Sequence, residues 1–452
     1  MEQNSISARF GKLIVWVPAL ALVIAISLVA RRSVSMADSG NSVFGLAYGF
    51  GPAVYNLFKL HRFGLIDPDH HWWAFALRMP FIPWFLEMLT AVSTNLTFQF
   101  LAKNILFYSI FLFALARLAA QYRISYRGQL GIVLAVLLIP FNALTGCRLE
   151  VEEGYLFPLM LVLYILLLIE KSKADYIWCG LVTAAIYLTK SSVGLLCLVA
   201  VLWVIFADFR RYRSFKFRST LPLIALLIAI VAWGGYVKVR TGRFAVGADE
   251  SSWNGENFYK SNNRYVLELY PYKTLDTLEH TGRLPVSGTV HDEWELNDAQ
   301  RSLGLQFIHE HPGDVLRMDL RKARVLFFEI RESPGPVRGK DRITVMISNA
   351  IDHILFAVFL GFALFDLWKG RLAEYTVLAL VITVTYLTPY FAGFLYQRHL
   401  VPLFGVVAIA LGLRLKQQWD ERTGQIAVSS SKRHGARSYV VNASSYVSNR
   451  RA

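Results

Sequence analysis

Uncharged apolar runs of about 20 residues recur along this chain and limit what it can fold into, because that length of helix crosses a membrane. Hydrophobic residues make up 55% of the sequence and charged residues 17%, whereas soluble domains carry roughly 25% charged residues. The alternative, a soluble protein with a large buried core, would not require so many long uncharged runs. The sequence therefore predicts an all-α polytopic membrane protein with about ten spans.

The spans can be placed by their apolar residues, and one further segment has two interpretations. The expected spans are Leu13–Ala30, Leu101–Ala116, Leu130–Leu144, Leu156–Ile169, Tyr176–Leu188, Val193–Phe206, Leu221–Val237, His353–Leu367, Thr376–Thr388 and Val401–Leu413. The segment Phe75–Val92 is either another span or a helix that lies in the membrane interface.

Basic short loops predict the orientation, because such loops stay in the cytoplasm. With a cytoplasmic N-terminus, the basic loops near residues 117–127, 210–218 and 369–371 all fall inside. The predicted spans and their orientation divide the chain into four regions. They are an N-terminal membrane module with the first outer loop (1–238), an extracytoplasmic, mainly helical insert (239–352), C-terminal membrane helices (353–415) and a basic cytoplasmic tail (416–452). The tail is rich in Ser and Arg and is expected to be disordered.

The net charge of +15 does not indicate a nucleic-acid partner. Most of the excess lies in the predicted cytoplasmic loops and tail, where it orients the protein and attracts anionic membrane lipids. Cys147, Cys179 and Cys197 are odd in number, and two of them lie in predicted spans. They form neither a disulfide framework nor a zinc motif.

Asp38 follows the first predicted span and is the candidate general base. At the boundary between water and lipid, its carboxylate could accept a proton from an acceptor while a lipid-borne donor lies in the adjacent membrane. The alternative interpretation is structural. Asp38 would then cap a helix over Ser39–Phe50, which is a common use of aspartate.

Charged residues interrupt apolar sequence at several positions on the predicted outer face. Arg78, Lys190 and Arg398 are candidates to bind a donor phosphate, because cations near the head-group layer are stabilised by anions. Glu152 and Glu153 open a predicted span and are candidates for substrate binding. Any one cation could instead anchor the protein at the interface, but several on one side together with carboxylates favour a site.

An ordered set of phrases resembles the C-class membrane glycosyltransferases, the superfamily of the protein O-mannosyltransferases and the lipid A aminoarabinose transferase. The phrases are "ADSGNSVFGLAYGF", "RMPFIPWFLEML", "EVEEGYLFPLMLVLY", "LTKSSVGLL", "SSWNGENFYKSNN", "HEHPGDVLRMDLRKARVLFF" and "YQRHLVPLFG". Two positions depart from the family pattern. Asp38 is followed by Ser rather than Glu, and His399 stands where a Tyr is usual. These departures leave the subfamily and the sugar unassigned.

The resemblance implies a fold, a reaction and a location. The fold would be a bundle of membrane helices with juxtamembrane helices on its outer face, in a bacterial inner membrane. A polyprenyl-phosphate-linked sugar would be transferred with inversion to an envelope glycolipid, a glycan or a protein. Asp38 would be the base, and Arg78, Lys190 and Arg398 would offset the charge of the leaving phosphate. The implied substrate-binding residues are Glu152, Glu153, Asn254, Asn257 and His399. The mannosyl and aminoarabinosyl enzymes imply no metal and no other cofactor.

Two other classes of function compete with this interpretation. An O-antigen ligase or polymerase shares the donor type and a large outer loop, but the acidic residue after the first span and the Asn-Gly phrase argue against it. A lipid-linked-sugar flippase or another transporter would often show two similar halves, and this sequence has none.

Overall fold

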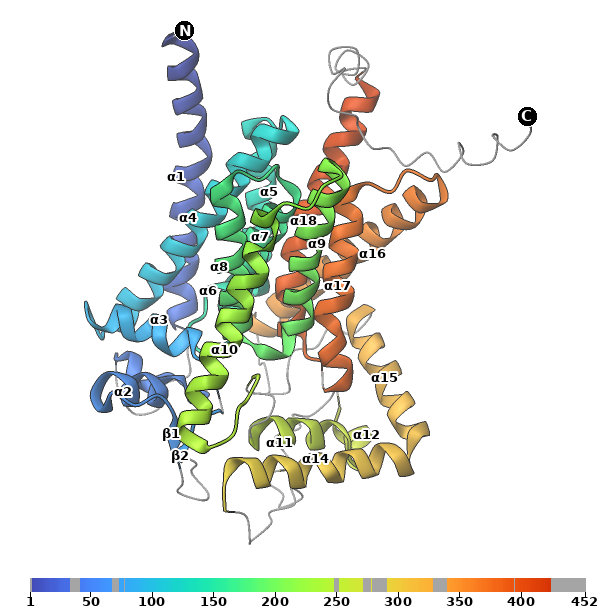
Figure 1. The fold of residues 1–452 in the computed structure, drawn as a ribbon. Coiled ribbons are helices and arrows are strands. Elements are labelled where there is room, and N and C mark those ends of the chain that lie inside the picture. The colour runs from blue at the N-terminus through green and yellow to red at the C-terminus, as the bar shows by residue number, and fades with distance from the viewer. Residues whose placement is uncertain are drawn as a thin grey trace.

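All ten predicted spans fall on α-helices of the computed structural model (Figure 1). The structure describes residues 2–32, 41–66, 73–76, 78–247, 252–270, 278, 291–327, 340–393 and 395–423. The helices that contain the predicted spans are α1 (Glu2–Arg32), α4 (Leu96–Tyr122), α5 (Tyr126–Leu137), α6 (Pro140–Cys147), α7 (Glu153–Leu168), α8 (Lys173–Thr189), α9 (Gly194–Tyr212), α10 (Leu221–Thr241), α16 (Lys340–Trp368), α17 (Glu374–Ala392) and α18 (Gln397–Arg422).

Seven helices within the described residues are long and apolar enough to cross a membrane, and the bent pair α5–α6 makes an eighth. The two members of that pair meet at 82°. The predicted spans in α7 and α8 form helices of 16 and 17 residues, which are shorter than a typical membrane span. The predicted class, a polytopic all-α membrane protein, is confirmed.

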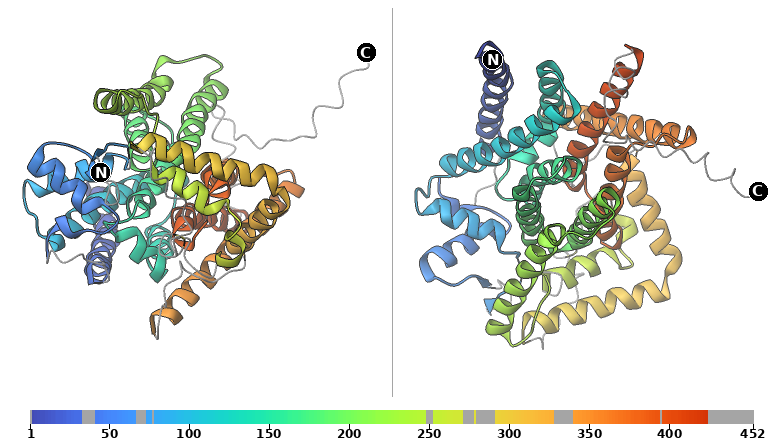
Figure 2. Two further views of the ribbon diagram at one scale, coloured as in Figure 1. Left: turned by 90° about the horizontal axis from the view of Figure 1, so that it is seen from below. Right: turned by 45° about the horizontal axis from the view of Figure 1, so that its top comes forward.

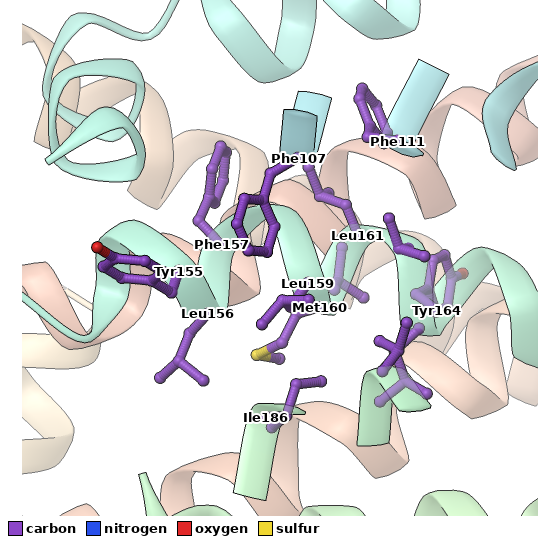
Figure 3. Close-up of a cluster of buried hydrophobic side chains, with 14 of the residues drawn as sticks. Phe107, Phe111, Tyr155, Leu156, Phe157, Leu159, Met160, Leu161, Tyr164 and Ile186 are labelled. Carbon is purple, nitrogen blue, oxygen red and sulfur yellow. The ribbon is translucent and has the colours of Figure 1, made fainter. Parts of the chain in front are cut away.

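The helix α7 lies at the centre of the bundle, and all of its residues are buried. Figure 3 shows its side chains packed against Phe107 and Phe111 of α4 and Ile186 of α8. Because other helices surround α7, a polar face would be buried without water, and the helix is therefore apolar on every side. Its first residue, Glu153, is therefore fixed by the best-packed element of the fold.

Short elements lie near one end of the bundle, between α1 and α4. They are a 3₁₀ turn η1 (Val43–Gly45), α2 (Phe50–Leu60), the hairpin of β1 (Leu65–Ile66) and β2 (Trp73–Ala74), and α3 (Phe81–Thr90). With ten residues α3 is too short to cross a membrane, and it exposes Trp84 and Met88. The interfacial interpretation of residues 75–92 fits this helix.

The insert is helical, as predicted, and lies across the same end of the bundle (Figures 1 and 2). Its helices are α11 (Ser252–Ser261), α12 (Val266–Leu269), α14 (Glu293–Glu310) and α15 (Pro312–Phe327). A Cβ on Gly255 would strike the backbone of Asn297, so the close approach of α11 to α14 requires glycine there. We call this end of the bundle the insert end and the opposite end, where α18 finishes, the tail end.

Candidate active site

A buried lysine shapes the loop that carries the two glutamates. Lys103 of α4 is fully buried, and its Nζ donates to the carbonyls of Gly146 (3.1 Å), Arg148 (3.2 Å) and Gly154. Gly154 has no room for a side chain, because a Cβ would overlap the carbonyl of Arg148. The loop is thus tied at both ends, and Glu152 and Glu153 are held at the N-terminus of α7, where the helix dipole favours negative charge.

Three distant segments meet these two carboxylates. Arg78 Nη1 donates to Glu152 Oε1 at 2.6 Å. Lys190 Nζ, between α8 and the 3₁₀ turn η2 (Ser191–Val193), lies 3.4 Å from Glu153 Oε1. The ring nitrogen Nε2 of His399, in α18, lies 3.7 Å from the same oxygen. The fold therefore brings together five residues that the sequence predicts as site residues.

Burial and charge act against each other in this cluster. Burial raises the pKa of Glu152, but Arg78 and Lys190 more than offset it, so the pKa falls below its usual value. Burial likewise lowers the pKa of Lys190, but Glu153 and Glu152 outweigh it, so the pKa is raised. Both residues are charged at neutral pH, and the cluster is a set of ion pairs rather than a shared proton.

Arg398 is the third cation of the cluster. It interacts electrostatically with both Glu152 and Glu153, which places it beside them. Within the described chain it forms no hydrogen bond or ion pair, and its buried Nε has no partner. Three cations thus face two carboxylates, and the surplus positive charge lies on a guanidinium whose donors are free for an anion.

Two tyrosines of α17 form an aromatic wall that the sequence analysis missed. Lys190 Nζ lies 5.2 Å from the ring centroid of Tyr390, and the rings of Tyr390 and His399 are 4.5 Å apart. The hydroxyls of Tyr390 and Tyr386 are 3.2 Å apart. Their spacing of four residues at the end of an apolar segment was the available signal, because it places both rings on one helix face.

The insert also contributes a buried carboxylate that the sequence analysis missed. Glu293 of α14 accepts hydrogen bonds from the backbone N–H groups of Phe75 (2.9 Å) and Ala76 (3.2 Å). These residues directly precede Arg78, whose Nε and Nη2 donate to the carbonyl of Tyr48 at 3.1 and 2.7 Å. The first outer segment and the insert therefore position Arg78 jointly.

The insert holds the end of α17 and the loop before α18 as well. Asn262 Nδ2 donates to the carbonyl of Ala392 at 3.3 Å. Lys322 Nζ donates to the carbonyl of Phe391, and the hydroxyl of Tyr270 donates to that of Leu395. Because α18 begins at Gln397, these bonds fix the start of the helix that carries Arg398 and His399.

Of the remaining predicted site residues, only Asn257 has a described side chain. Asp38 lies outside the described residues, as does the side chain of Asn254. Asn257 is exposed on α11 and forms no hydrogen bond with the cluster within the described chain. The alternative role of Asp38 as the cap of a helix over residues 39–50 is wrong, because residues 43–45 form a 3₁₀ turn that Ser42 caps and α2 begins only at Phe50.

Part of the chain is similar to a known sequence family. Residues 78–234, roughly a third of the chain, match the model of the family described as dolichyl-phosphate-mannose-protein mannosyltransferase. A sequence search of curated proteins finds no match. The matched range contains Arg78, Glu152, Glu153 and Lys190, whereas Asp38 and Arg398 lie outside it.

Two solved structures share a low similarity with this protein. The crystal structure of ArnT from Cupriavidus metallidurans bound to undecaprenyl phosphate is 12% identical, with a TM-score of 0.36. The apo form of the same protein is 13% identical, with a TM-score of 0.34. Each similarity covers 87% of this chain and 77% of the other. The family match over residues 78–234 confirms the resemblance of this chain to the C-class membrane glycosyltransferases.

Proposed function

We propose that this protein is an integral membrane glycosyltransferase that uses a polyprenyl-phosphate-linked sugar. The acceptor would be an extracytoplasmic glycolipid, glycan or protein of the cell envelope. The observation that carries the proposal is the charged cluster, in which Arg398 forms no described hydrogen bond or ion pair while Arg78 and Lys190 are held by Glu152 and Glu153. An anionic group would balance the surplus charge, and a phosphate suits a guanidinium that offers several donors.

The proposed reaction divides the work between the cluster and Asp38. The acceptor hydroxyl or amine attacks the anomeric carbon of the sugar, and Asp38 accepts its proton. The bond between that carbon and the phosphate oxygen breaks, and the polyprenyl phosphate leaves with the bonding electrons. Attack from the opposite face inverts the anomeric centre. Arg398 and Lys190 stabilise the charge that develops on the phosphate, so no separate general acid is required.

The order of the chain around Asp38 is consistent with this role. Arg31, at the end of α1, donates to the side chain of Asn41, so the two ends of the segment that contains Asp38 are close together. Seven residues after Asn41, the carbonyl of Tyr48 accepts both hydrogen bonds from Arg78. The described chain that follows this segment therefore reaches the cluster at Tyr48.

The function can be tested in the envelope and in a reconstituted membrane. Mass spectrometry should find a glycolipid or glycan that lacks one sugar in a deletion strain and regains it with the wild-type gene. An Arg398→Gln gene should restore it only in part. The purified protein should then release polyprenyl phosphate from its sugar donor only when the acceptor is present. Movement of the intact donor across the bilayer without cleavage would contradict the proposal and indicate a flippase.

We also propose that the insert end faces away from the cytoplasm. Cations at the ends of α4, α9 and α16 gather at the tail end, where Arg117 pairs with Asp175 and Arg211 with Glu170. Alkaline phosphatase fused at Gly288 of the insert should therefore be active, and phosphatase fused after Thr423 should be silent. The reverse pattern would place the cluster on the cytoplasmic side and exclude an extracytoplasmic acceptor.

A further inference from the structure

A second polar cavity lies at the tail end, far from the candidate active site. It has a volume of about 310 Å³ and lies between the ends of α16 and α18 and the loop that follows α16. The charged residues that line it are Asp366, Lys369, Arg371, Arg414, Glu421 and Arg422. Arg414 follows Arg398 by 16 positions on the same helix, which separates the cavity from the charged cluster by ~24 Å along the helix.

The cavity contains a buried arginine with one donor left over. Arg414 is 8% exposed, and its Nε and Nη2 donate to Asp366 Oδ2 and Oδ1, each at 2.6 Å. Its Nη1 is buried and has no hydrogen-bond partner within the described residues. Buried N–H groups are almost always paired, so this donor indicates an acceptor that comes from outside the described chain.

The charge of the cavity selects an anion. Four cations line it against two carboxylates, which leaves two positive charges in excess. The carboxylate of Asp366 is fully engaged by Arg414, and Glu421 accepts a hydrogen bond from Gln417 Nε2 at 2.9 Å. The cations of Lys369, Arg371 and Arg422 form no ion pair among the described residues, so they are available to an incoming phosphate.

The rim of the cavity is apolar on the side of α16. Phe365, Leu367 and Trp368 are exposed at the end of this candidate membrane span, and Lys369 Nζ lies 4.2 Å from the ring centroid of Trp368. Tryptophan beside lysine at the end of a span is typical of the level of the lipid head groups. A phosphate in the cavity can therefore remain attached to acyl chains that lie along α16.

We propose that this cavity binds the phosphate of an anionic phospholipid in the leaflet at the tail end. Basic pockets between membrane helices recognise lipid head groups in this way. The lipid would join α16 to α18, and α18 carries Arg398 and His399 at its other end. The site is independent of the sugar-transfer proposal, because it is argued from its own cavity, charge and rim.

The test measures lipid binding and needs no sugar transfer. Native mass spectrometry of the full chain in detergent, titrated with phosphatidylglycerol or phosphatidylcholine, should show tighter binding of phosphatidylglycerol. The Lys369→Gln/Arg371→Gln variant should lose at least about tenfold in affinity for it, because each cation near a charged head group contributes measurably. Arg422→Gln, in the last turn of α18, is a second variant that leaves the loop unchanged and should also weaken binding.

The matched control removes two exposed cations at the same end of the bundle but outside the cavity. Lys173→Gln/Arg210→Gln has the same charge loss and should bind phosphatidylglycerol like the wild type. Equal losses in the two double variants would show that the lipid follows the overall charge of this surface, and the pocket would be rejected. Displacement of the lipid by an equal concentration of inorganic phosphate would assign the cavity to a soluble anion and also overturn the proposal.

Discussion

Replacing Asp38 with asparagine should lower the rate of sugar transfer by about 10²–10⁴-fold and leave the protein folded with its donor bound. Asparagine keeps the shape of the side chain but cannot take a proton from the acceptor. A general base acts in the chemical step, so kcat should fall while donor binding is retained. Single-turnover transfer from a radiolabelled polyprenyl-phosphate sugar, measured beside equilibrium donor binding, separates the two quantities.

The structure contradicts the alternative role of Asp38 as the cap of a helix over residues 39–50. A loss of activity in Asp38→Asn could therefore not be assigned to the loss of that cap. The first described α-helix after Asp38 begins at Phe50, and the turn at residues 43–45 is capped by Ser42, so the helix over residues 39–50 that Asp38 would cap is not formed. Asp298→Asn, at an exposed position of α14, is the matched control and should be fully active. If Asp38→Asn transferred sugar at a normal rate, Asp67 and Asp69 would become the candidates, because Glu152 and Glu153 are held in ion pairs.

Much of the cluster could be predicted because helix ends follow from apolar length and loop charge. Lys190, Arg398 and the two glutamates lie where a predicted span begins or ends, Arg78 lies in the predicted first outer segment, and a consistent topology puts them all at the same end of the bundle. Apolar length and loop charge predict at which end of the bundle a residue lies. They do not say which of its neighbours it contacts.

The parts that were missed depend on tertiary contacts with no local pattern. Glu293 contacts the backbone of Phe75, which lies more than 200 residues away in the sequence. In the sequence Lys103 is a single cation in an apolar run, and only the structure shows that it binds backbone carbonyls. The helix expected over residues 39–50 is replaced by turns. There the chain is fixed by backbone hydrogen bonds from Val43 to Thr94 and from Leu96 to Asn41, so long-range pairing overrides local propensity.

The insert therefore has a structural role in the site that its sequence does not reveal. It binds the segment between β2 and Arg78 through Glu293, the end of α17 through Asn262 and Lys322, and the loop before Arg398 through Tyr270. The first and the last of these segments lead to Arg78 and Arg398, which both interact with the glutamates. Their positions relative to each other are set by a domain outside the bundle, which explains why a largely membrane-embedded protein keeps a polar insert of this size.

Replacing Arg398 with glutamine should reduce kcat/KM for the lipid-linked donor by about 10- to 100-fold, the expected cost of losing a charged hydrogen bond to the phosphate. Steady-state transfer rates over a range of donor concentrations measure it. The same change should alter the melting temperature of the donor-free protein only slightly. Arg398 has no described hydrogen bond or ion pair to lose, and its attraction to Glu152 and Glu153 is opposed by its repulsion from Arg78 and Lys190. A purely structural residue would behave in the opposite way.

The matched control removes a charged pair from the same cluster without changing its net charge. In Arg78→Gln/Glu152→Gln both members of an ion pair become neutral, so we expect a smaller loss of kcat/KM than in Arg398→Gln. Arg78→Gln alone should be less stable than the double variant, because it leaves Glu152 buried beside Glu153 without its partner. If Arg398→Gln kept normal donor kinetics and also lowered the melting temperature, Arg398 would be a packing residue, and the phosphate would have to be bound by the paired cations Arg78 and Lys190.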